Sequence, residues 1–420
     1  MQNIKIKNPQ LLLTEAEKEL EKHFLELQAI EEHNFNKVLN TFIESKVGEQ
    51  HFSWVTGYGH DDLGREKLDE VFAKVFNAEA AIVRPFFASG THTISCCLFG
   101  CLRPGDELIS IAGKPYDSLH EVIGIEAGKN KSGSLTDFGI VYKEVPLKDG
   151  IIIDIPAIEN AITEKTKMVF IQRSKGYEWR KSLNIVDIKK IIEIAKKKNK
   201  NCICFVDNCF GEFTETLEPT DVGADLTCGS LIKNIGGGIV TAGGYIAGKK
   251  ELVELSSERL TAPGIGSEGG CMFDTTRTIF QGLFYAPHTV AQVLKGISLT
   301  SIIFEKLGYE VTPRFNELKT DIVAGIKIKD RTLVEQICKT VQSNSPVNSY
   351  LTPEACNLPG YPDKVIMAGG TFIEGSTIEL SCDAPMRDPY ILYFQGGLNY
   401  LHTKFCLKKI LEVFYTGQQM

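Results

Sequence analysis

Lys233 and Asp207 are the side chains whose types and spacing most directly suggest chemistry. Asp207 ends the apolar run 202–206, which is typical of a buried strand, and Lys233 follows 26 residues later in a stretch of small residues. A lysine amine can hold pyridoxal phosphate covalently, and a buried carboxylate can keep the ring nitrogen of that cofactor protonated. We therefore expect this cofactor, and we expect burial to lower the pKa of Lys233.

A phosphate site is predicted at Ser89-Gly90-Thr91, which follows one expected strand and opens an apolar helix. A helix N-terminus offers free N–H groups and a partial positive charge, and a glycine lets the backbone approach an anion closely. Ser230, three residues before the lysine, could add another hydroxyl. The Ser-Gly-Thr fragment alone would also suit an ordinary helix cap, so its value depends on its order before Asp207 and Lys233.

Two further side chains have both a chemical and a structural interpretation. Tyr116 lies between an expected strand and an expected helix, where it could stack on the cofactor ring and move protons, or simply pack on the core. Arg387 stands between Pro385 and Pro389, where a rigid loop could present it to a substrate carboxylate, although exposed arginines are common.

Short apolar runs alternate with helical patterns from residue 80 onward, which predicts an α/β protein with a mostly parallel sheet wrapped by helices. The expected strands are 80–83, 108–111, 140–145, 168–171, 202–206 and 245–247. The expected helices are 14–45, 66–77, 91–102, 117–127, 155–163 and 185–198. Ligands of such sheets bind beyond the carboxyl ends of the strands, where Asp207 and Gln172 would lie.

The C-terminal part predicts a smaller α/β domain, reached through a helical stretch at 274–307 that contains Pro287. Its expected elements are a helix at 332–342, a strand at 376–382 and a helix at 394–415. We divide the chain into an N-terminal helix and arm (1–65), a large cofactor-binding domain (66–300) and a small domain (301–420). The arm is rich in aromatic residues and could reach a neighbouring subunit's site.

The composition excludes several classes of protein. The 420 residues carry a net charge of −7, which gives no electrostatic footprint for nucleic acid or an anionic membrane. The first residues lack the apolar core of a signal peptide, and no apolar run approaches membrane-spanning length, so a cytoplasmic protein is expected. Its twelve cysteines are then reduced thiols without the spacing of a zinc site, and no metal is expected. Cys209 and Cys228 flank the expected site, and one of them could touch the cofactor.

Several strings together resemble a known family. The strings are Thr56-Gly-Tyr-Gly-His-Asp-Asp, Gly113-Lys-Pro-Tyr-Asp-Ser-Leu, Ile171-Gln-Arg-Ser-Lys-Gly-Tyr, Gly229-Ser-Leu-Ile-Lys-Asn and Ala384-Pro-Met-Arg. With them the chain resembles the Cys/Met-metabolism branch of the fold-type I pyridoxal-phosphate enzymes. It is most similar to the methionine γ-lyase-like group labelled aluminium-resistance proteins and cystathionine β-lyases.

The resemblance implies a role for each candidate residue. Lys233 would hold the cofactor, Asp207 would bind its ring nitrogen and Tyr116 would stack on its ring. The phosphate would lie against Gly90, Thr91 and Ser230, and Arg387 would bind the substrate carboxylate. Tyr58 would come from the partner subunit, which implies a homodimer or homotetramer.

Two positions depart from the better-studied lyases. Ile232 stands before the lysine where those enzymes have a threonine, so one contact to the cofactor is lost. His60 stands where they have an arginine, and Arg65 is a candidate to replace it. These differences weaken any transfer of substrate specificity.

The expected reaction is cleavage of a carbon–sulfur bond in a sulfur amino acid, of the cystathionine β-lyase or methionine γ-lyase type, with release of a thiol, ammonia and a 2-keto acid. The same fold could instead support transamination or side-chain cleavage, because a fold alone does not decide a reaction. A non-catalytic protein that binds the cofactor, and a metal-binding protein, are the non-enzymatic alternatives.

Overall fold

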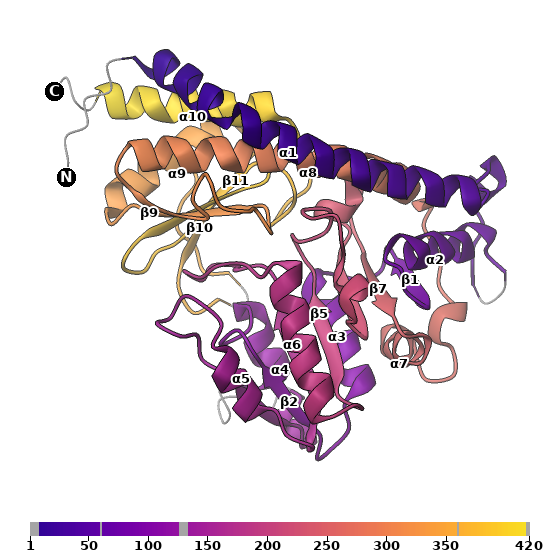
Figure 1. The fold of residues 1–420 in the computed structure, drawn as a ribbon. Coiled ribbons are helices and arrows are strands. Elements are labelled where there is room, and N and C mark those ends of the chain that lie inside the picture. The colour runs from indigo at the N-terminus through magenta and orange to yellow at the C-terminus, as the bar shows by residue number, and fades with distance from the viewer. Residues whose placement is uncertain (1–7, 59–60, 126–132, 359–360, 417–420) are drawn as a thin grey trace.

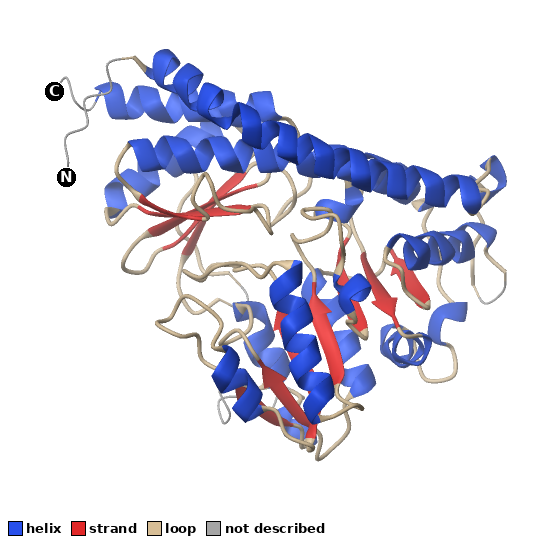
Figure 2. Cartoon of the chain, viewed as in Figure 1, coloured by secondary structure: helices blue, strands red, loops and turns tan. Residues whose placement is uncertain are grey.

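The structure, a computed structural model, describes residues 8–58, 61–125, 133–358 and 361–416. Two sheets with their helices form the body of the chain, and one long helix crosses both (Figure 1). Figure 2 shows strands enclosed by helices in the larger part and a smaller sheet under helices in the other. This is the predicted α/β architecture.

The larger sheet has seven strands within the described ranges, in the order β1-β7-β6-β5-β4-β2-β3. The neighbours from β6 to β3 are parallel, whereas β7 is antiparallel to both β1 and β6. The strands are β1 (Ala80–Arg84), β2 (Glu107–Ser110), β3 (Val141–Glu144), β4 (Thr166–Gln172), β5 (Ile203–Asp207), β6 (Leu226–Ser230) and β7 (Gly244–Gly248).

Alternation along the strands supplies two apolar faces for this sheet, because successive side chains point to opposite sides. On β4, Met168 and Phe170 face one core, whereas Val169 and Ile171 face the other. The first core is covered by α3 (Gly90–Cys101), α4 (His120–Ile123) and α7 (Lys250–Leu260), and the second by α5 (Ile155–Ala161) and α6 (Ile185–Lys198). Both faces are therefore buried, as a largely parallel sheet requires.

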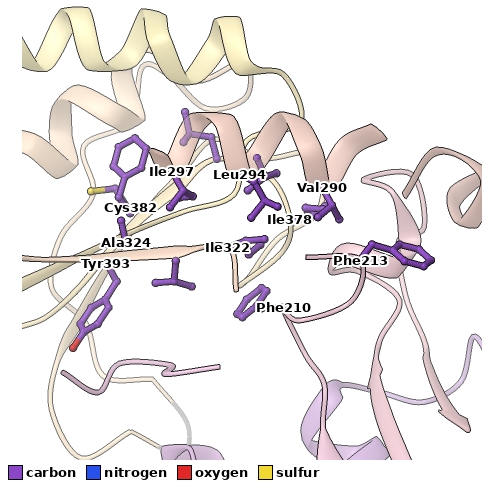
Figure 3. Close-up of a cluster of buried hydrophobic side chains, with 14 of the residues drawn as sticks. Phe210, Phe213, Val290, Leu294, Ile297, Ile322, Ala324, Ile378, Cys382 and Tyr393 are labelled. Atoms are coloured by element: carbon purple, nitrogen blue, oxygen red, sulfur yellow. The ribbon is translucent and has the colours of Figure 1, made fainter. Parts of the chain in front are cut away.

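The smaller sheet is antiparallel, with the order β10-β11-β12-β9-β8 among the residues that the structure describes. Its strands are β8 (Glu310–Thr312), β9 (Val323–Lys327), β10 (Val365–Ala368), β11 (Ser381–Pro385) and β12 (Ile391–Gln395). The helices α9 (Arg331–Ser343) and α10 (Tyr400–Thr416) pack with it. Figure 3 shows side chains of this sheet, such as Ala324 and Cys382, meeting Leu294 and Ile297 of α8.

Two long helices connect the two parts. The helix α8 (Thr276–Lys306) runs as one element that contains Pro287, and α1 (Pro9–Glu44) lies along it (Figure 1). The short helix α2 (Leu63–Val75) packs beside β1. The predicted division at residues 65 and 300 is consistent with strands at 80–248 and 310–395, and its boundaries stay a prediction.

Four sequence predictions of local structure differ from the structure. Residues 226–230, which no predicted strand included, form the central strand β6. The predicted helix at 117–127 stops at Ile123, because Gly124 takes a left-handed φ of 83°. Residues 391–395 form β12, and α10 begins only at Tyr400, after two glycines with positive φ. The strand predicted at 376–382 begins later, at Ser381.

Candidate active site

A cavity of about 380 Å³ lies between the two sheets, at the carboxyl ends of β4, β5 and β6. Residues near the smaller sheet, including Tyr361 and Met367, close its other side. The lining includes these residues predicted from sequence: Ser89, Gly90, Thr91, Tyr116, Gln172, Asp207, Ser230 and Lys233. Parallel strands that end at one sheet edge bring these distant segments together.

Lys233 is three residues beyond the end of β6, and its amine faces the cavity. The amine lies 4.3 Å from the ring centroid of Phe210. It forms no hydrogen bond or ion pair with any described residue. This lysine is thus half-buried and has no polar partner among the described residues, which suits a group that forms a bond to a cofactor.

The predicted lowering of the Lys233 pKa was wrong. Burial is the largest single effect and lowers it. The charges of Cys209, Asp207, Glu212 and Tyr361 together outweigh burial, and the net pKa lies above the ordinary lysine value. The sequence prediction considered burial alone, because the neighbours of the lysine are set by the tertiary fold.

Asp207 is the last residue of β5, and all of that strand is buried. Its Oδ1 accepts a hydrogen bond of 3.1 Å from the backbone N–H of Cys209. Burial raises the pKa of the carboxyl, while the positive charge of Lys233 opposes that rise. No described residue forms an ion pair with Asp207, so a protonated ring nitrogen would supply a missing positive partner.

The N-terminus of α3 forms the expected cradle for a phosphate. Ser89 is its N-cap, with its hydroxyl accepting from the backbone N–H of His92 at 3.1 Å. A Cβ placed on Gly90 would lie 3.5 Å from the Cβ of Ser230 and 3.9 Å from the amine of Lys233. The free N–H groups at this helix start therefore lie within reach of both the lysine and Ser230, as a phosphate held there would require.

Hydroxyl groups complete the cradle. The Thr91 hydroxyl is 2.6 Å from that of Ser118, and the Ser230 hydroxyl donates to the carbonyl of Gly243 at 3.3 Å. An amine, a carboxylate and a set of N–H and hydroxyl donors thus surround one cavity. These are the groups that the amine-reactive carbon, ring nitrogen and phosphate of pyridoxal phosphate require, so the residues present fit this cofactor.

Tyr116 lines the same cavity as Lys233 and is held there by hydrogen bonds. Its backbone N–H donates to the side chain of Gln172 at 2.6 Å, and its hydroxyl is hydrogen-bonded to that of Tyr361. A Cβ on Gly176 would come within 2.7 Å of the Tyr116 ring, so glycine is needed there. Burial and the neighbouring Tyr361 raise the Tyr116 pKa well above its ordinary value, so the phenol keeps its proton at neutral pH.

Two predicted residues lie outside the cavity lining of this chain. Tyr58 is 92% exposed, and Arg387 binds Asp363 at 3.1 Å and lies 3.7 Å from Glu178. Arg65 is buried and donates to the carbonyls of Gly57 and Gly270, so its guanidinium anchors the segment before Tyr58. His60 lies outside the described residues.

Sequence reasoning missed Tyr361 and Ser118. Ser118 could have been found, because it follows Tyr116 by two residues in the same motif. Tyr361 offers no such signal, since it comes from the small-domain side and only the fold places it near Tyr116.

Cys209 and Cys228 were the two cysteines named as candidates to touch the cofactor. Cys209 lines the cavity and Cys228 does not. All twelve cysteines lie in described ranges and are free thiols.

Fold and cavity together define the class of this protein, a fold-type I enzyme that uses pyridoxal phosphate. The family model for methionine γ-lyase matches residues 10–415. The chain therefore belongs to the methionine γ-lyase family and is a lyase.

Known proteins agree with this assignment. The chain is 50% identical over 380 residues to the uncharacterized protein YnbB of Bacillus subtilis, and the aligned region covers 90% of each chain. A crystal structure of a carbon-sulfur lyase involved in aluminum resistance from Clostridium novyi NT matches with 48% identity and a TM-score of 0.92, covering 96% of this chain and 95% of the other. The L-methionine gamma-lyase of Pseudomonas putida is 24% identical over 62% of this chain and 55% of its own length.

No helix in the described ranges of the chain combines the length and apolarity needed to cross a bilayer. Within the same ranges, no three His, Cys, Asp or Glu side chains are grouped so that they could hold a metal ion.

Proposed function

We propose that this protein cleaves a carbon–sulfur bond in a sulfur amino acid, takes up one water and releases a thiol, ammonia and a 2-keto acid. The observation that carries the proposal is Lys233, a half-buried lysine that has no polar partner among the described residues and shares a cavity with Asp207 and Tyr116. The family and the likeness to the Clostridium novyi lyase support the same reaction class.

Each of these residues has a distinct task in the proposal. Lys233 would hold the cofactor, and its amine would take the proton from the α carbon of the substrate. Pyridoxal phosphate, when bound, would supply an electron sink. Asp207 keeps the ring nitrogen protonated. The Tyr116 hydroxyl, whose high pKa keeps it protonated, donates a proton to the departing sulfur.

Arg387 is proposed to bind the substrate carboxylate. Its guanidinium would exchange Asp363 for the substrate, since arginine binds carboxylates through two parallel hydrogen bonds. Its position supports this role. Burial raises the pKa of Asp117, the residue after Tyr116, and the positive charge of Arg387 partly opposes that rise. We further propose a cytoplasmic dimer or tetramer in which Tyr58 is donated across the subunit interface.

The test is to incubate the purified holoenzyme with methionine, cysteine, cystathionine and homocysteine and to identify the keto acid. Pyruvate would establish β-elimination, and 2-ketobutyrate from methionine would establish γ-elimination. A requirement for a keto-acid acceptor would indicate transamination instead. Bound cofactor without any keto acid from the four compounds would contradict the lyase proposal and leave a cofactor-binding protein.

A further inference from the structure

Tyr361 lines the cofactor cavity, and the reaction described above gives it no task. It lies between α9 and β10, on the side of the smaller sheet, whereas Lys233 and Tyr116 come from the larger part of the chain. Its hydroxyl is hydrogen-bonded to the hydroxyl of Tyr116, the group proposed to protonate the departing sulfur. The proton donor of the reaction is therefore directly connected to a second phenol.

The fold holds the Tyr361 ring against Tyr116. The two ring centroids lie 5.8 Å apart with the ring planes at 85°, an edge-to-face contact of a favourable kind. The ring of Tyr177 lies 5.7 Å from that of Tyr361 on another side. Behind the ring, the backbone N–H of Met386 donates to the carbonyl of Lys364 at 2.8 Å and ties this segment to the end of β11. Packing and backbone hydrogen bonds thus keep the two hydroxyls together.

Tyr116 needs such a partner if it gives up its proton. A phenolate in a site shielded from water is costly unless another group donates a hydrogen bond to it. Among the residues that the structure describes, the Tyr361 hydroxyl is the hydrogen-bond partner of the Tyr116 hydroxyl. Tyr361 is therefore the group that can stabilise Tyr116 after the sulfur has been protonated.

The two phenols differ in acidity. Burial raises the pKa of both hydroxyls. For Tyr116, the negative charge of Tyr361 and the hydrogen bond between them raise the pKa further. For Tyr361, the same hydrogen bond and the positive charge of Lys233 oppose the rise. Tyr361 is thus the stronger acid of the pair, so a negative charge formed on the Tyr116 oxygen favours transfer of a proton from Tyr361.

We propose that Tyr361 is the proton source behind Tyr116: as the Tyr116 hydroxyl protonates the departing sulfur, the Tyr361 hydroxyl passes its own proton to the Tyr116 oxygen. Tyr361 acts through Tyr116 and is in this sense a positioning residue. The inference rests on the proposed lyase function. The protons balance, because the negative charge ends on Tyr361 while Lys233 holds the α-proton as an ammonium group. That proton then restores the Tyr361 hydroxyl before the next turnover.

The test compares two leaving groups on the holoenzyme. S-ethyl-L-cysteine releases an alkanethiol, whose sulfur needs a proton to leave at neutral pH. S-(2-nitrophenyl)-L-cysteine releases an aryl thiolate that the nitro group stabilises, so its sulfur can leave without a proton. Each compound takes up one water and gives pyruvate, ammonia and either ethanethiol or 2-nitrothiophenolate, the latter with a proton released to solvent. The matching homocysteine derivatives, with 2-ketobutyrate as product, serve if the enzyme eliminates from the γ carbon.

In Tyr361→Phe, kcat/KM for the ethyl compound should fall roughly 10- to 100-fold, the range of a hydrogen bond to a charged group. The value for the nitrophenyl compound and the cofactor absorption spectrum should change little. Tyr177→Phe is the matched control, because it removes a hydroxyl from the same group of rings, one that binds Asp383 at 2.9 Å and not Tyr116. Its ratio of the two kcat/KM values should equal that of the unmodified enzyme. Equal losses for both compounds in Tyr361→Phe, or no loss, would overturn the proposal.

A double-mutant cycle gives a second measurement. Tyr116→Phe removes the group through which Tyr361 acts, so adding Tyr361→Phe to it should lower kcat/KM for the ethyl compound little further. A further loss as large as that of Tyr361→Phe alone would mean that Tyr361 acts independently of Tyr116, which contradicts the proposal.

Failure of this inference can be separated from failure of the proposed function. If the unmodified enzyme forms no keto acid from either compound or from the four sulfur amino acids, the lyase function is wrong, and the role of Tyr361 falls with it. If the unmodified enzyme cleaves both compounds and Tyr361→Phe treats them alike, the lyase function stands and only the role of Tyr361 is wrong.

Discussion

At the scale of single residues, the site depends on what surrounds each ionisable group. Lys233 is buried in the sequence prediction and half-buried in the structure, yet its pKa moves upward because acidic groups surround it. A side chain's chemistry therefore follows from its neighbours in space, and these are seldom its neighbours in sequence.

We expect Lys233→Ala to abolish turnover. This amine is proposed both to hold the cofactor and to move the α-proton, and a positioned acid or base alone is worth about 10²–10⁴-fold. The measurement is keto-acid formation together with the cofactor absorption spectrum. Lys250→Ala removes an exposed lysine at the start of α7 and should leave both unchanged. Substantial keto-acid formation by Lys233→Ala would contradict the assigned role.

Glu212 should make stability fall as pH rises. Burial raises the pKa of its carboxyl from 4.5 to about 8, aided by the negative charge of Glu218, and its Oε2 has no hydrogen-bond partner within the described chain. The folded state therefore holds a proton that the unfolded state releases above about pH 4.5. The free energy of unfolding therefore falls as the pH rises from about 4.5 to about 8. Above the higher pKa, Glu212 causes no further loss.

Glu212→Gln should remove most of this dependence, because glutamine cannot ionise and can still accept the 3.0 Å hydrogen bond from Tyr245. Urea unfolding of the cofactor-free protein at pH 5 and pH 8 measures this pH dependence of the free energy of unfolding. The unmodified chain should lose on the order of a few kcal/mol more than the variant over this interval. The exposed Glu251→Gln is the control. Parallel losses in all three proteins would show that Glu212 ionises normally.

At the scale of elements, α8 links the two sheets and α1. Figure 3 shows Val290, Leu294 and Ile297 of this helix pointing at the small-domain core. Because the cofactor cavity lies between the sheets, the packing of α8 indirectly sets the distance between its two walls.

Leu294→Ala is therefore expected to destabilise the protein by about 2–5 kcal/mol, the usual cost of removing a buried leucine side chain and leaving a cavity. Leu294 is 1% exposed, whereas Leu401 on α10 is 65% exposed. Leu401→Ala should change the free energy of unfolding by less than about 0.5 kcal/mol. Chemical denaturation compares the two variants, and equal effects would mean that the α8 core is not closely packed.

At the scale of the whole molecule, the N-terminal arm faces outward. Trp54 and Tyr58 are exposed, and the buried Arg65 holds the carbonyl of Gly57 in place. An ordered segment with exposed aromatic side chains suits a surface that a second copy of the chain would cover.

Complementation tests the proposed exchange of Tyr58 between subunits. Lys233→Ala and Tyr58→Ala, each with little activity alone, should recover part of the activity when unfolded together and refolded as a mixture. A hybrid dimer would then hold one site with an intact lysine from one subunit and an intact tyrosine from the other. Light scattering confirms the dimer. No recovery in a mixture that contains hybrid dimers would place Tyr58 outside the neighbouring site.

The sequence by itself determined the local features of this protein. Apolar alternation and helical periodicity located most of the large-sheet elements, and the segments around Ser89, Asp207 and Lys233 carried enough local information to indicate the cofactor. These signals depend only on residues near one another in the chain, so they can be read without a fold.

The tertiary structure decided what depends on long-range packing. It made the small residues of β6 a strand between β5 and β7, and it raised the pKa of Lys233. It also brought Tyr361 to Tyr116. Burial and charge at these positions come from segments far apart in sequence, which meet only when the two sheets pack against each other.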